Sequence, residues 1–317
     1  MSRSDRERVL VTGGAGFIGS HIVEALVAEG YRVRVLDDLS TGRASNLDAV
    51  RDRIEMIEAS ASDFSACEEA AEGVAYVFHE AAIPSVPRSV AEPLPSHESG
   101  PTATLNVLEA SRRAGVRRLM FAASSSAYGD AEVLPKVETL LPDPLSPYAA
   151  GKLAGEHYVR VYARTMGLDG VSLRYFNIFG PRQDPSSPYS GVISLFIKAM
   201  SRGERPRIYG DGSQTRDFTY VENAVRANLA AMRAEGPLLG KALNVGCGDR
   251  ISLLDLVSTL NAILGTDLEP EFLPARAGDV RDSLAGLGLI ERELGYRPSV
   301  DFAEGLRRTV ASVVEAG

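Results

Sequence analysis

The first half of the chain alternates short runs of Val, Ile, Leu and Phe with longer segments whose apolar residues recur at helical spacing. The short runs predict buried strands, and the longer segments predict helices with one apolar face. We expect strands at residues 8–12, 32–36, 54–59, 76–79, 118–123 and 170–175. We expect helices between them at residues 20–29, 67–71, 103–114 and 147–165. This alternation predicts an α/β fold, a doubly wound, Rossmann-type parallel sheet covered on both faces.

The regular alternation ends after Phe176. Residues 180–216 are rich in Gly, Pro, Ser and Arg, which is typical of a region dominated by loops. Strand and helix patterns return at 218–235, 242–245, 253–264 and 302–314. We therefore expect two closely packed parts with a cleft between them. The larger part comprises residues 1–176 and 217–245, and a smaller C-terminal α/β part comprises residues 177–216 and 246–317.

A glycine-rich turn follows the first predicted strand and opens the first predicted helix. A strand, a glycine turn and a helix in this order hold the pyrophosphate of a dinucleotide on the helix N-terminus. Such a turn needs backbone angles and a close approach to phosphate oxygens that a Cβ atom would block. We predict that the cofactor is bound here by Gly13, Gly16, Phe17, Ile18 and Gly19.

Asp37 ends the second predicted strand. A carboxylate at this distance from the glycine turn suits the 2′-hydroxyl of a ribose and repels a 2′-phosphate. The predicted cofactor is therefore NAD rather than NADP. A tight turn alone would explain the glycines, but the preceding strand, the following helix and Asp37 together favour cofactor binding.

Composition narrows the class of protein. The 317 residues are 44% hydrophobic, enough for a large core, and the net charge of −8 offers no basic surface for nucleic acid. Cys67 and Cys247 fit neither a ligand spacing nor a disulfide framework, which suits a reducing cytoplasm. The four histidines form no pair at metal-ligand spacing, so no metal is expected. The polar start and the lack of a long apolar run predict neither a signal segment nor a membrane span.

A second group of candidate residues lies at the start of the predicted helix 147–165. Ser146 supplies a helix cap and Pro147 a first-turn proline, so Tyr148 and Lys152 share one helix face. A nearby ammonium stabilises a phenolate, and we expect it to lower the pKa of Tyr148 from about 10 toward neutrality, where the phenolate acts as a general base. Taken alone, the pair is better explained by an amphipathic helix whose lysine reaches solvent.

Three hydroxyls follow the predicted strand 118–123, at the end where open parallel sheets bind ligands. They belong to Ser124, Ser125 and Ser126. A hydroxyl there can hydrogen-bond a substrate alcohol or carbonyl and stabilise a developing oxyanion. Serine runs are common in loops, but a serine run and a Tyr–Lys pair that both follow a dinucleotide turn favour a catalytic site.

With these motifs the chain resembles the extended short-chain dehydrogenases/reductases. Within them it is similar to the nucleotide-sugar 4-epimerases, the UDP-glucose and UDP-N-acetylglucosamine 4-epimerase group. The resemblance covers nearly the whole length. Beyond the three motifs above it is carried by segments 37–42 (DDLSTG), 79–82 (HEAA), 85–89 (SVPRS), 174–183 (RYFNIFGPRQ), 210–218 (GDGSQTRDF) and 278–283 (GDVRDS).

The resemblance implies a role for each matching residue. Tyr148 is implied as the base on the sugar 4-hydroxyl, Lys152 as the residue that binds the nicotinamide ribose and tunes Tyr148, and Ser124 as the third catalytic residue. The other implied NAD contacts are Asp37, Asp38, Ser40, Thr41, Gly42, Ser60, Ala61, Ala81, Ala82 and Tyr175. The implied substrate contacts are Ser85, Arg88, Ser125, Ser126, Asn177, Gln183, Gly191, Val192, Tyr209, Arg216, Arg281 and Ser283.

Some of these contacts are implied in more detail. Asn177 is expected near the diphosphate and the sugar. Arg216 and Arg281 are expected to bind the diphosphate, for which a planar guanidinium is well shaped. By the same resemblance, the larger part of the chain binds NAD and the smaller part binds the nucleotide sugar.

Two positions depart from the family pattern. The Gly–Asp pair that usually follows the third strand, and whose Asp meets the adenine amino group, is Ala59–Ser60 here. Ser60 could still accept a hydrogen bond. The Asn usual before the helix at 103–114 is Gly100, followed by Pro101. Neither change removes a catalytic group.

The residues at three site positions limit the possible reactions and the possible sugars. Related dehydratases carry an Asp–Glu pair in place of Ser125 and Ser126, because removal of water needs an acid and a base. Related decarboxylases usually carry Glu in place of Ser126, so the two hydroxyls favour inversion at C4. Ser283 matches a residue that walls the sugar pocket near C2, and its small side chain should admit N-acetylated sugars.

The resulting prediction is an NAD-dependent epimerase that inverts C4 of a UDP-sugar through a 4-keto intermediate. The expected substrates are UDP-GlcNAc/UDP-GalNAc, UDP-Glc/UDP-Gal, or both. A UDP-glucuronate 4-epimerase or decarboxylase remains an alternative, as does a non-catalytic dinucleotide-sensing protein. From the family we also expect a homodimer that joins through residues 103–114 and 147–165, and from the cysteine usage we expect a cytoplasmic location.

Overall fold

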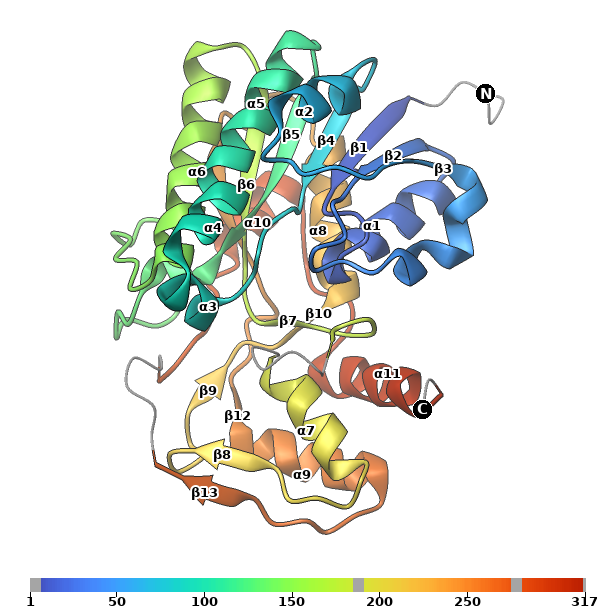
Figure 1. Cartoon of the computed structure of the whole chain (residues 1–317). Helices are drawn as coiled ribbons and strands as arrows, with labels where there is room; N and C mark the ends of the chain where they lie inside the picture. Colours follow the sequence, from blue (N-terminus) through green and yellow to red (C-terminus); the bar gives the residue numbers. More distant parts are fainter. Residues whose placement is uncertain (1–6, 185–190, 275–280, 316–317) are drawn as a thin grey trace.

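A seven-stranded parallel sheet lies at the centre of the computed structural model, which describes residues 7–184, 191–274 and 281–315 (Figure 1). The strand order β11-β6-β5-β4-β1-β2-β3 changes direction between β1 and β4. Such a switch leaves a crevice at the carboxyl ends of the strands. The predicted α/β fold of Rossmann type is confirmed. The strands are β1 (Arg8–Thr12), β2 (Arg32–Leu36), β3 (Ile54–Ile57), β4 (Tyr76–His79), β5 (Arg118–Ser124), β6 (Asp169–Tyr175) and β11 (Lys241–Val245).

Each face of the sheet has its own layer of helices. Val9 and Val11 of β1 pack into one core and Leu10 into the other, as expected where successive residues alternate between faces. The first face is covered by α1 (Phe17–Ala28), α8 (Val221–Arg233), α10 (Gly288–Leu294) and a 3-10 helix (Ala44–Arg53). The second face is covered by α2 (Phe64–Ala71), α5 (Ala103–Arg113) and α6 (Pro147–Thr165). Burial on both faces explains why the central strands β1, β4 and β5 are mostly apolar. No helix in the described part of the chain is both long and apolar enough to cross a bilayer.

A smaller part lies beyond the carboxyl ends of the sheet strands, in the lower half of Figure 1. Its core is aromatic at one end, where the ring of Phe302 stacks on Phe218 at 5.7 Å and meets Phe179 edge-on at 5.9 Å. Its helices are α7 (Val192–Met200), α9 (Leu253–Leu264) and α11 (Phe302–Glu315). Three short strand pairs complete it: β7 (Ile178–Phe179) with β10 (Thr219–Tyr220), β8 (Arg207–Tyr209) with β13 (Glu271–Leu273), and β9 (Thr215–Arg216) with β12 (Ile251–Ser252).

Several boundaries differ from the predicted ones. Helix α1 begins at Phe17 rather than at residue 20, because the glycine turn itself leads into the helix at its N-cap, Gly16. Helix α2 begins at Phe64 rather than at residue 67, since the Asp63 side chain caps it by accepting a hydrogen bond from the Ser65 amide at 2.9 Å. Strand β3 ends at Ile57, two residues before its predicted end.

The segment between β4 and α5 is helical where the sequence predicted none. It forms α3 (Val86–Ala91), α4 (Pro93–His97) and a π-helical turn (Glu98–Thr102) that leads directly into α5. Prolines are compatible with α3 and α4, because these helices carry theirs in the first turn, where the missing N–H costs no hydrogen bond. Pro101, in the π turn, packs beside Gly151 of α6, where an added Cβ would lie 3.2 Å from the proline ring.

Candidate functional site

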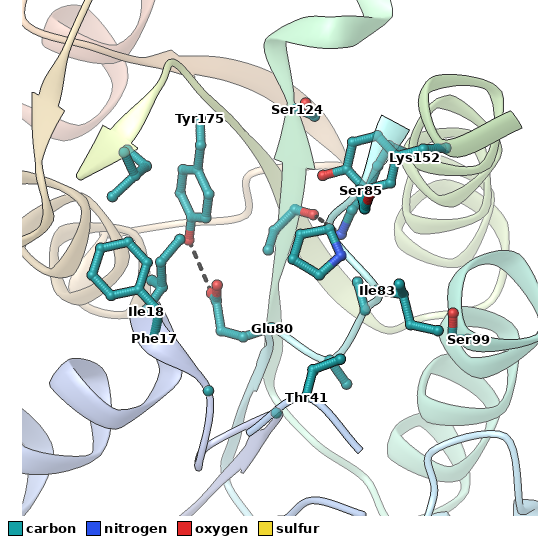
Figure 2. Close-up of a pocket in the computed structure, with 18 of the residues that line it drawn as sticks. Phe17, Ile18, Thr41, Glu80, Ile83, Ser85, Ser99, Ser124, Lys152 and Tyr175 are labelled. Atoms are coloured by element: carbon teal, nitrogen blue, oxygen red, sulfur yellow. Dashed lines mark hydrogen bonds between the residues drawn. The ribbon is translucent and has the colours of Figure 1, made fainter. Parts of the chain in front are cut away.

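A cleft of about 1160 Å³ runs along the carboxyl ends of the sheet strands and reaches the smaller part of the molecule (Figure 2). All residues that the sequence assigned to catalysis or to NAD line this cleft. Of the predicted substrate residues, Val192, Tyr209 and Arg281 do not line it, and the others do. The first three residues of the 278–283 motif fall outside the described residues.

The glycine turn at one end of the cleft is packed too tightly for side chains. Gly13 has a φ of +68°, and an added Cβ would lie 2.6 Å from the amide nitrogen of Ala81. An added Cβ on Gly19 would lie 2.2 Å from the Gly13 carbonyl oxygen. No side chain caps α1 at Gly16, so its first amides are left for an anion at the positive end of the helix. The turn therefore fits a dinucleotide pyrophosphate.

Asp37 connects the end of β2 to this turn. One carboxylate oxygen accepts a hydrogen bond from the Ala15 amide and the other from the Leu39 amide, both at 2.9 Å. Desolvation raises the pKa of Asp37, and these two bonds oppose the rise. Each oxygen keeps a lone pair for a ribose hydroxyl, and the negative charge disfavours a 2′-phosphate. The site thus fits NAD, as the sequence predicted.

The position of Ser60, where the family pattern has Asp, also lines the cleft. Its hydroxyl accepts a hydrogen bond from the Ser62 amide at 3.2 Å and so shapes the turn after β3. A lone pair remains for a further donor.

Helix α6 carries Tyr148 and Lys152 into the cleft. The helix begins with the Ser146 hydroxyl accepting a hydrogen bond from the Ala149 amide at 3.2 Å. The ammonium of Lys152 donates to the carbonyl of Ala122, at the end of β5, at 2.6 Å, and lies 6.0 Å from the centre of the Tyr148 ring. Desolvation lowers the pKa of Lys152 to about 8, against the opposing charges of Glu80 and Glu156.

The pKa of Tyr148 is shifted in the direction opposite to the predicted one. We expected Lys152 to lower it toward neutrality, but desolvation raises it to about 12, and the charge of Glu80 raises it further. A hydrogen bond with Ser124 is the opposing influence. The prediction was wrong because it weighed one attractive charge against a solvated tyrosine and left out the cost of burying a phenolate.

The serine run turns into a short 3-10 helix (Ser125–Tyr128) directly after β5. The Ser124 hydroxyl accepts hydrogen bonds from the Ser126 amide at 3.1 Å and from the Ser126 hydroxyl at 2.8 Å. These bonds leave the O–H of Ser124 free to turn toward Tyr148. All three serines line the cleft.

Glu80 is a titratable cleft residue to which the sequence analysis gave no role. It follows β4 and accepts a hydrogen bond from the Tyr175 hydroxyl at 2.9 Å (Figure 2). Desolvation raises the pKa of Glu80 to about 7, opposed by the Tyr175 bond and by the charge of Lys152. The sequence did hold a signal, since a carboxylate at the end of an apolar strand run is unusual.

At the other end of the cleft, one carboxylate ties three segments together. Asp217 is completely buried and accepts hydrogen bonds from the amides of Cys247 (2.8 Å), Gly248 (2.9 Å) and Ala285 (3.0 Å). This fixes the segment that contains Ser283, which lines the cleft. The smaller part therefore contributes to the site through backbone contacts that sequence patterns do not reveal.

The three predicted substrate residues outside the cleft have other surroundings. Arg281 is exposed, and its backbone carbonyl accepts a hydrogen bond from the Arg216 guanidinium at 3.0 Å. Val192 packs against the core of the smaller part, and Tyr209 ends β8, which pairs with β13. Arg216 does line the cleft.

Lys136 is a further cleft residue that the sequence analysis passed over. Its side chain is 2% exposed, and its ammonium has no hydrogen-bond partner among the described residues. Its amide and carbonyl bond to Leu284 and Gly286, which places it beside the segment of Ser283. Desolvation lowers the pKa of Lys136, and the charges of Asp130 and Asp282 oppose this.

Comparison with known proteins agrees with this geometry. Residues 9–246 match the profile of the NAD dependent epimerase/dehydratase family. The chain belongs to this family. It is 41% identical over 308 residues to a UDP-glucose 4-epimerase of Mycolicibacterium smegmatis, with 96% of this chain and 97% of that protein covered.

Two solved structures of this family are closely similar. One is a UDP-N-acetylglucosamine 4-epimerase from Methanobrevibacter ruminantium M1 in complex with UDP-N-acetylmuramic acid, with a TM-score of 0.94, 38% identity and coverage of 98% of this chain and 99% of that one. The other is a UDP-glucose 4-epimerase with UDP-glucose from Thermotoga maritima, with a TM-score of 0.92, 40% identity and the same coverage. The predicted family and the predicted cofactor, NAD, are confirmed.

Gly19→Ala should abolish the retention of NAD. The new methyl group would overlap the Gly13 carbonyl and force α1 away from the turn. The cofactor released from the denatured, purified protein measures retention. Gly288→Ala is the matched control, because nothing lies within 4 Å of its added Cβ. Wild-type NAD content in Gly19→Ala would contradict the assignment of the turn.

Tyr148→Phe should lower kcat by about 100-fold or more, the usual contribution of general base catalysis. Folding and NAD content should not change, because only the phenolic oxygen is lost. Tyr76→Phe at the far end of β4 is the control and should keep wild-type activity. Comparable activity in both variants would place the base elsewhere.

Proposed function

We propose that the protein is an NAD-dependent epimerase that inverts C4 of a UDP-sugar through a 4-keto intermediate. The observation that carries the proposal is the convergence of Tyr148, Lys152 and Ser124 in the cleft that also contains the glycine turn. The same convergence makes a non-catalytic dinucleotide sensor the weaker hypothesis, since a sensor needs no phenol beside an ammonium.

In this proposal the residues of α6 and β5 move and hold one proton. Tyr148 takes the proton of the sugar 4-hydroxyl as C4 loses its hydride and becomes a carbonyl. Ser124 hydrogen-bonds the reacting oxygen, and Lys152 supplies a positive charge that favours the phenolate. NAD, when bound, supplies a cationic hydride acceptor. After the keto sugar turns over, Tyr148 returns the proton and C4 regains its hydride, so the net redox change is zero.

Because the pKa of Tyr148 is high in the protein alone, we expect the charge of a bound cofactor to be needed to lower it. A phenol with a pKa of about 12 is a reluctant base at neutral pH. A positive charge brought into the same desolvated cleft lowers this pKa more than it would in water. Tyr148 is therefore expected to become an effective base only in the complete complex.

The hydroxyls at positions 125 and 126 support epimerisation over dehydration or decarboxylation. The Ser126 side chain donates to Ser124, so it belongs to the hydrogen-bond network of the proposed catalytic residues. For the sugar, the small side chain of Ser283 in the cleft wall supports UDP-GlcNAc/UDP-GalNAc, with UDP-Glc/UDP-Gal as overlapping substrates.

One observation favours a second candidate, UDP-glucuronate. The buried ammonium of Lys136 lacks a hydrogen-bond partner among the described residues and lines the cleft near Ser283. A buried unpaired charge is costly, and a carboxylate on the sugar would relieve this cost. Asp130 and Asp282 already offset part of the charge, which is why we place this candidate second.

The purified protein should interconvert UDP-GlcNAc and UDP-GalNAc without added NAD, because the cofactor is regenerated in each turnover. NMR spectra after incubation with UDP-GlcNAc, UDP-Glc and UDP-glucuronate identify the products. No C4-inverted product from any of the three would overturn the proposed function.

Lys136→Met separates the two candidates in the same assay. If the first candidate holds, the variant keeps most of its activity on UDP-GlcNAc. A selective loss of activity on UDP-glucuronate, together with a wild-type preference for that sugar, would establish the second candidate instead. Lys198→Met, on α7 and outside the residues that line the cleft, is the control.

We also propose a homodimer that joins through α5 and α6. Leu105 on α5 and Val161 on α6 are exposed, with 37% and 48% of their surface accessible. The double variant Leu105→Glu with Val161→Glu should be a monomer by light scattering, because it places charges in an apolar contact. Met56→Glu on β3 is the control and should stay dimeric. A monomeric wild-type protein would contradict this proposal.

A further inference from the structure

Glu80 is held in one orientation by a chain of hydrogen bonds. The Tyr175 hydroxyl donates to one carboxylate oxygen at 2.9 Å, and the Asn228 amide donates to the Tyr175 oxygen at 2.6 Å. Asn228 is in turn held on α8 by donating to the Ala224 carbonyl at 3.0 Å. The second carboxylate oxygen of Glu80 has no hydrogen-bond partner among the described residues, and Glu80 lines the cleft. One oxygen is therefore fixed and the other is available.

The elements around Glu80 contribute few charges. Helix α1 presents Phe17 and Ile18 to this part of the cleft, as Figure 2 shows. On β4 itself, His79 is neutral, because desolvation and the charge of Lys152 lower its pKa to about 3. Apart from Lys152, the titratable groups that interact with Glu80 among the described residues are the hydroxyls of Tyr148 and Tyr175, whose pKa values are both raised by desolvation.

Lys152 and Glu80 both line the cleft, and the charge of Lys152 lowers the pKa of Glu80, although no direct ion pair joins them among the described residues. Glu156, one turn further along α6, is already paired with Arg174 through two hydrogen bonds of 2.8 and 2.7 Å. Glu80 is therefore the carboxylate that balances Lys152. With Glu80 ionised, this end of the cleft is close to neutral, and without it the end carries one positive charge.

From this arrangement we propose that Glu80 is a positioning residue that favours the oxidised, cationic form of bound NAD by balancing the charge of Lys152. Reduction of a nicotinamide ring removes its positive charge, so an uncompensated ammonium nearby favours the reduced form. The inference rests on the proposed function only in placing the ring near Tyr148 and Lys152. An epimerase needs this bias, because enzyme left with reduced cofactor cannot begin a cycle.

The test is a reductive titration of the purified holoenzyme without any sugar. The bound cofactor is equilibrated with a reductant couple of known potential, and the near-ultraviolet absorbance of reduced nicotinamide gives the ratio of reduced to oxidised cofactor. Glu80→Gln keeps an acceptor for Tyr175 and loses the charge. Its ratio should rise about tenfold or more at about pH 7.5, between the pKa values of Glu80 and Lys152, which is the size expected for one charge at intermediate dielectric. Glu58→Gln, on the exposed surface, should leave the ratio unchanged.

The pH dependence of the ratio of reduced to oxidised cofactor tests whether the charge of Glu80 is responsible. Glu80 has a raised pKa of about 7, so it is ionised above this pH and neutral below it. The difference between Glu80→Gln and the wild type should be largest between about pH 7 and pH 8, where Glu80 is ionised and Lys152 is protonated, and should vanish as the pH falls below 7. Equal ratios at every pH, or an equal rise in Glu58→Gln, would overturn the proposal.

If Glu80→Gln loses its cofactor, Glu80→Asp shows whether charge or packing is responsible, because it keeps the charge on a shorter side chain. Recovery of NAD retention with a ratio near that of the wild type supports a role for the charge. Loss of the cofactor in both variants assigns Glu80 to packing and rejects the proposal. No outcome depends on epimerase activity, so failure of the sugar assay leaves this test intact.

Discussion

The contact between the Lys152 ammonium and the Ala122 carbonyl, at 2.6 Å, is the constraint on which the site depends. It fixes the first turns of α6 against the end of β5 and so sets the position of Tyr148 relative to Ser124. One turn further along α6, the buried pair of Glu156 and Arg174 holds the same helix to β6. Helix and sheet are joined by charged contacts that are strong only because they are shielded from water.

Burial rather than pairwise attraction sets the protonation states of this site. Desolvation is the largest influence on Tyr148, Lys152 and Glu80, and in each case it favours the neutral form. The fold therefore holds a neutral phenol beside an ammonium and a carboxylate whose charges partly cancel. Such a site changes its proton affinity when a charged ligand enters, since charges among desolvated groups are only weakly screened. In the proposed function, charge brought in by the ligands is therefore what makes Tyr148 an effective base.

The sequence revealed most of the fold because strands buried on both faces must be apolar, and helices between them must have apolar faces. The glycine turn, Asp37 and the Tyr148–Lys152 pair could be found because each depends on local spacing. The helices of residues 86–102 were missed, since prolines that suggest a loop are equally compatible with a first helical turn. The pKa of Tyr148 depends on tertiary burial, and so does the Lys136 ammonium, which has no hydrogen-bond partner in the described part of the chain. No local sequence pattern encodes such burial.

The two ends of the cleft are built differently, and the difference suits the proposed cycle. At the glycine end, the backbones of Gly13, Gly19 and Ala81 are in such close contact that a single methyl group would not fit. At the other end, Asp217 joins loop segments through three amide hydrogen bonds, and small side chains such as Ser283 line the wall. A tightly packed cradle keeps a dinucleotide in place through many turnovers, because its release would require backbone rearrangement. A wall of loops and small side chains leaves room for a sugar ring to turn over, which inversion through a keto intermediate requires.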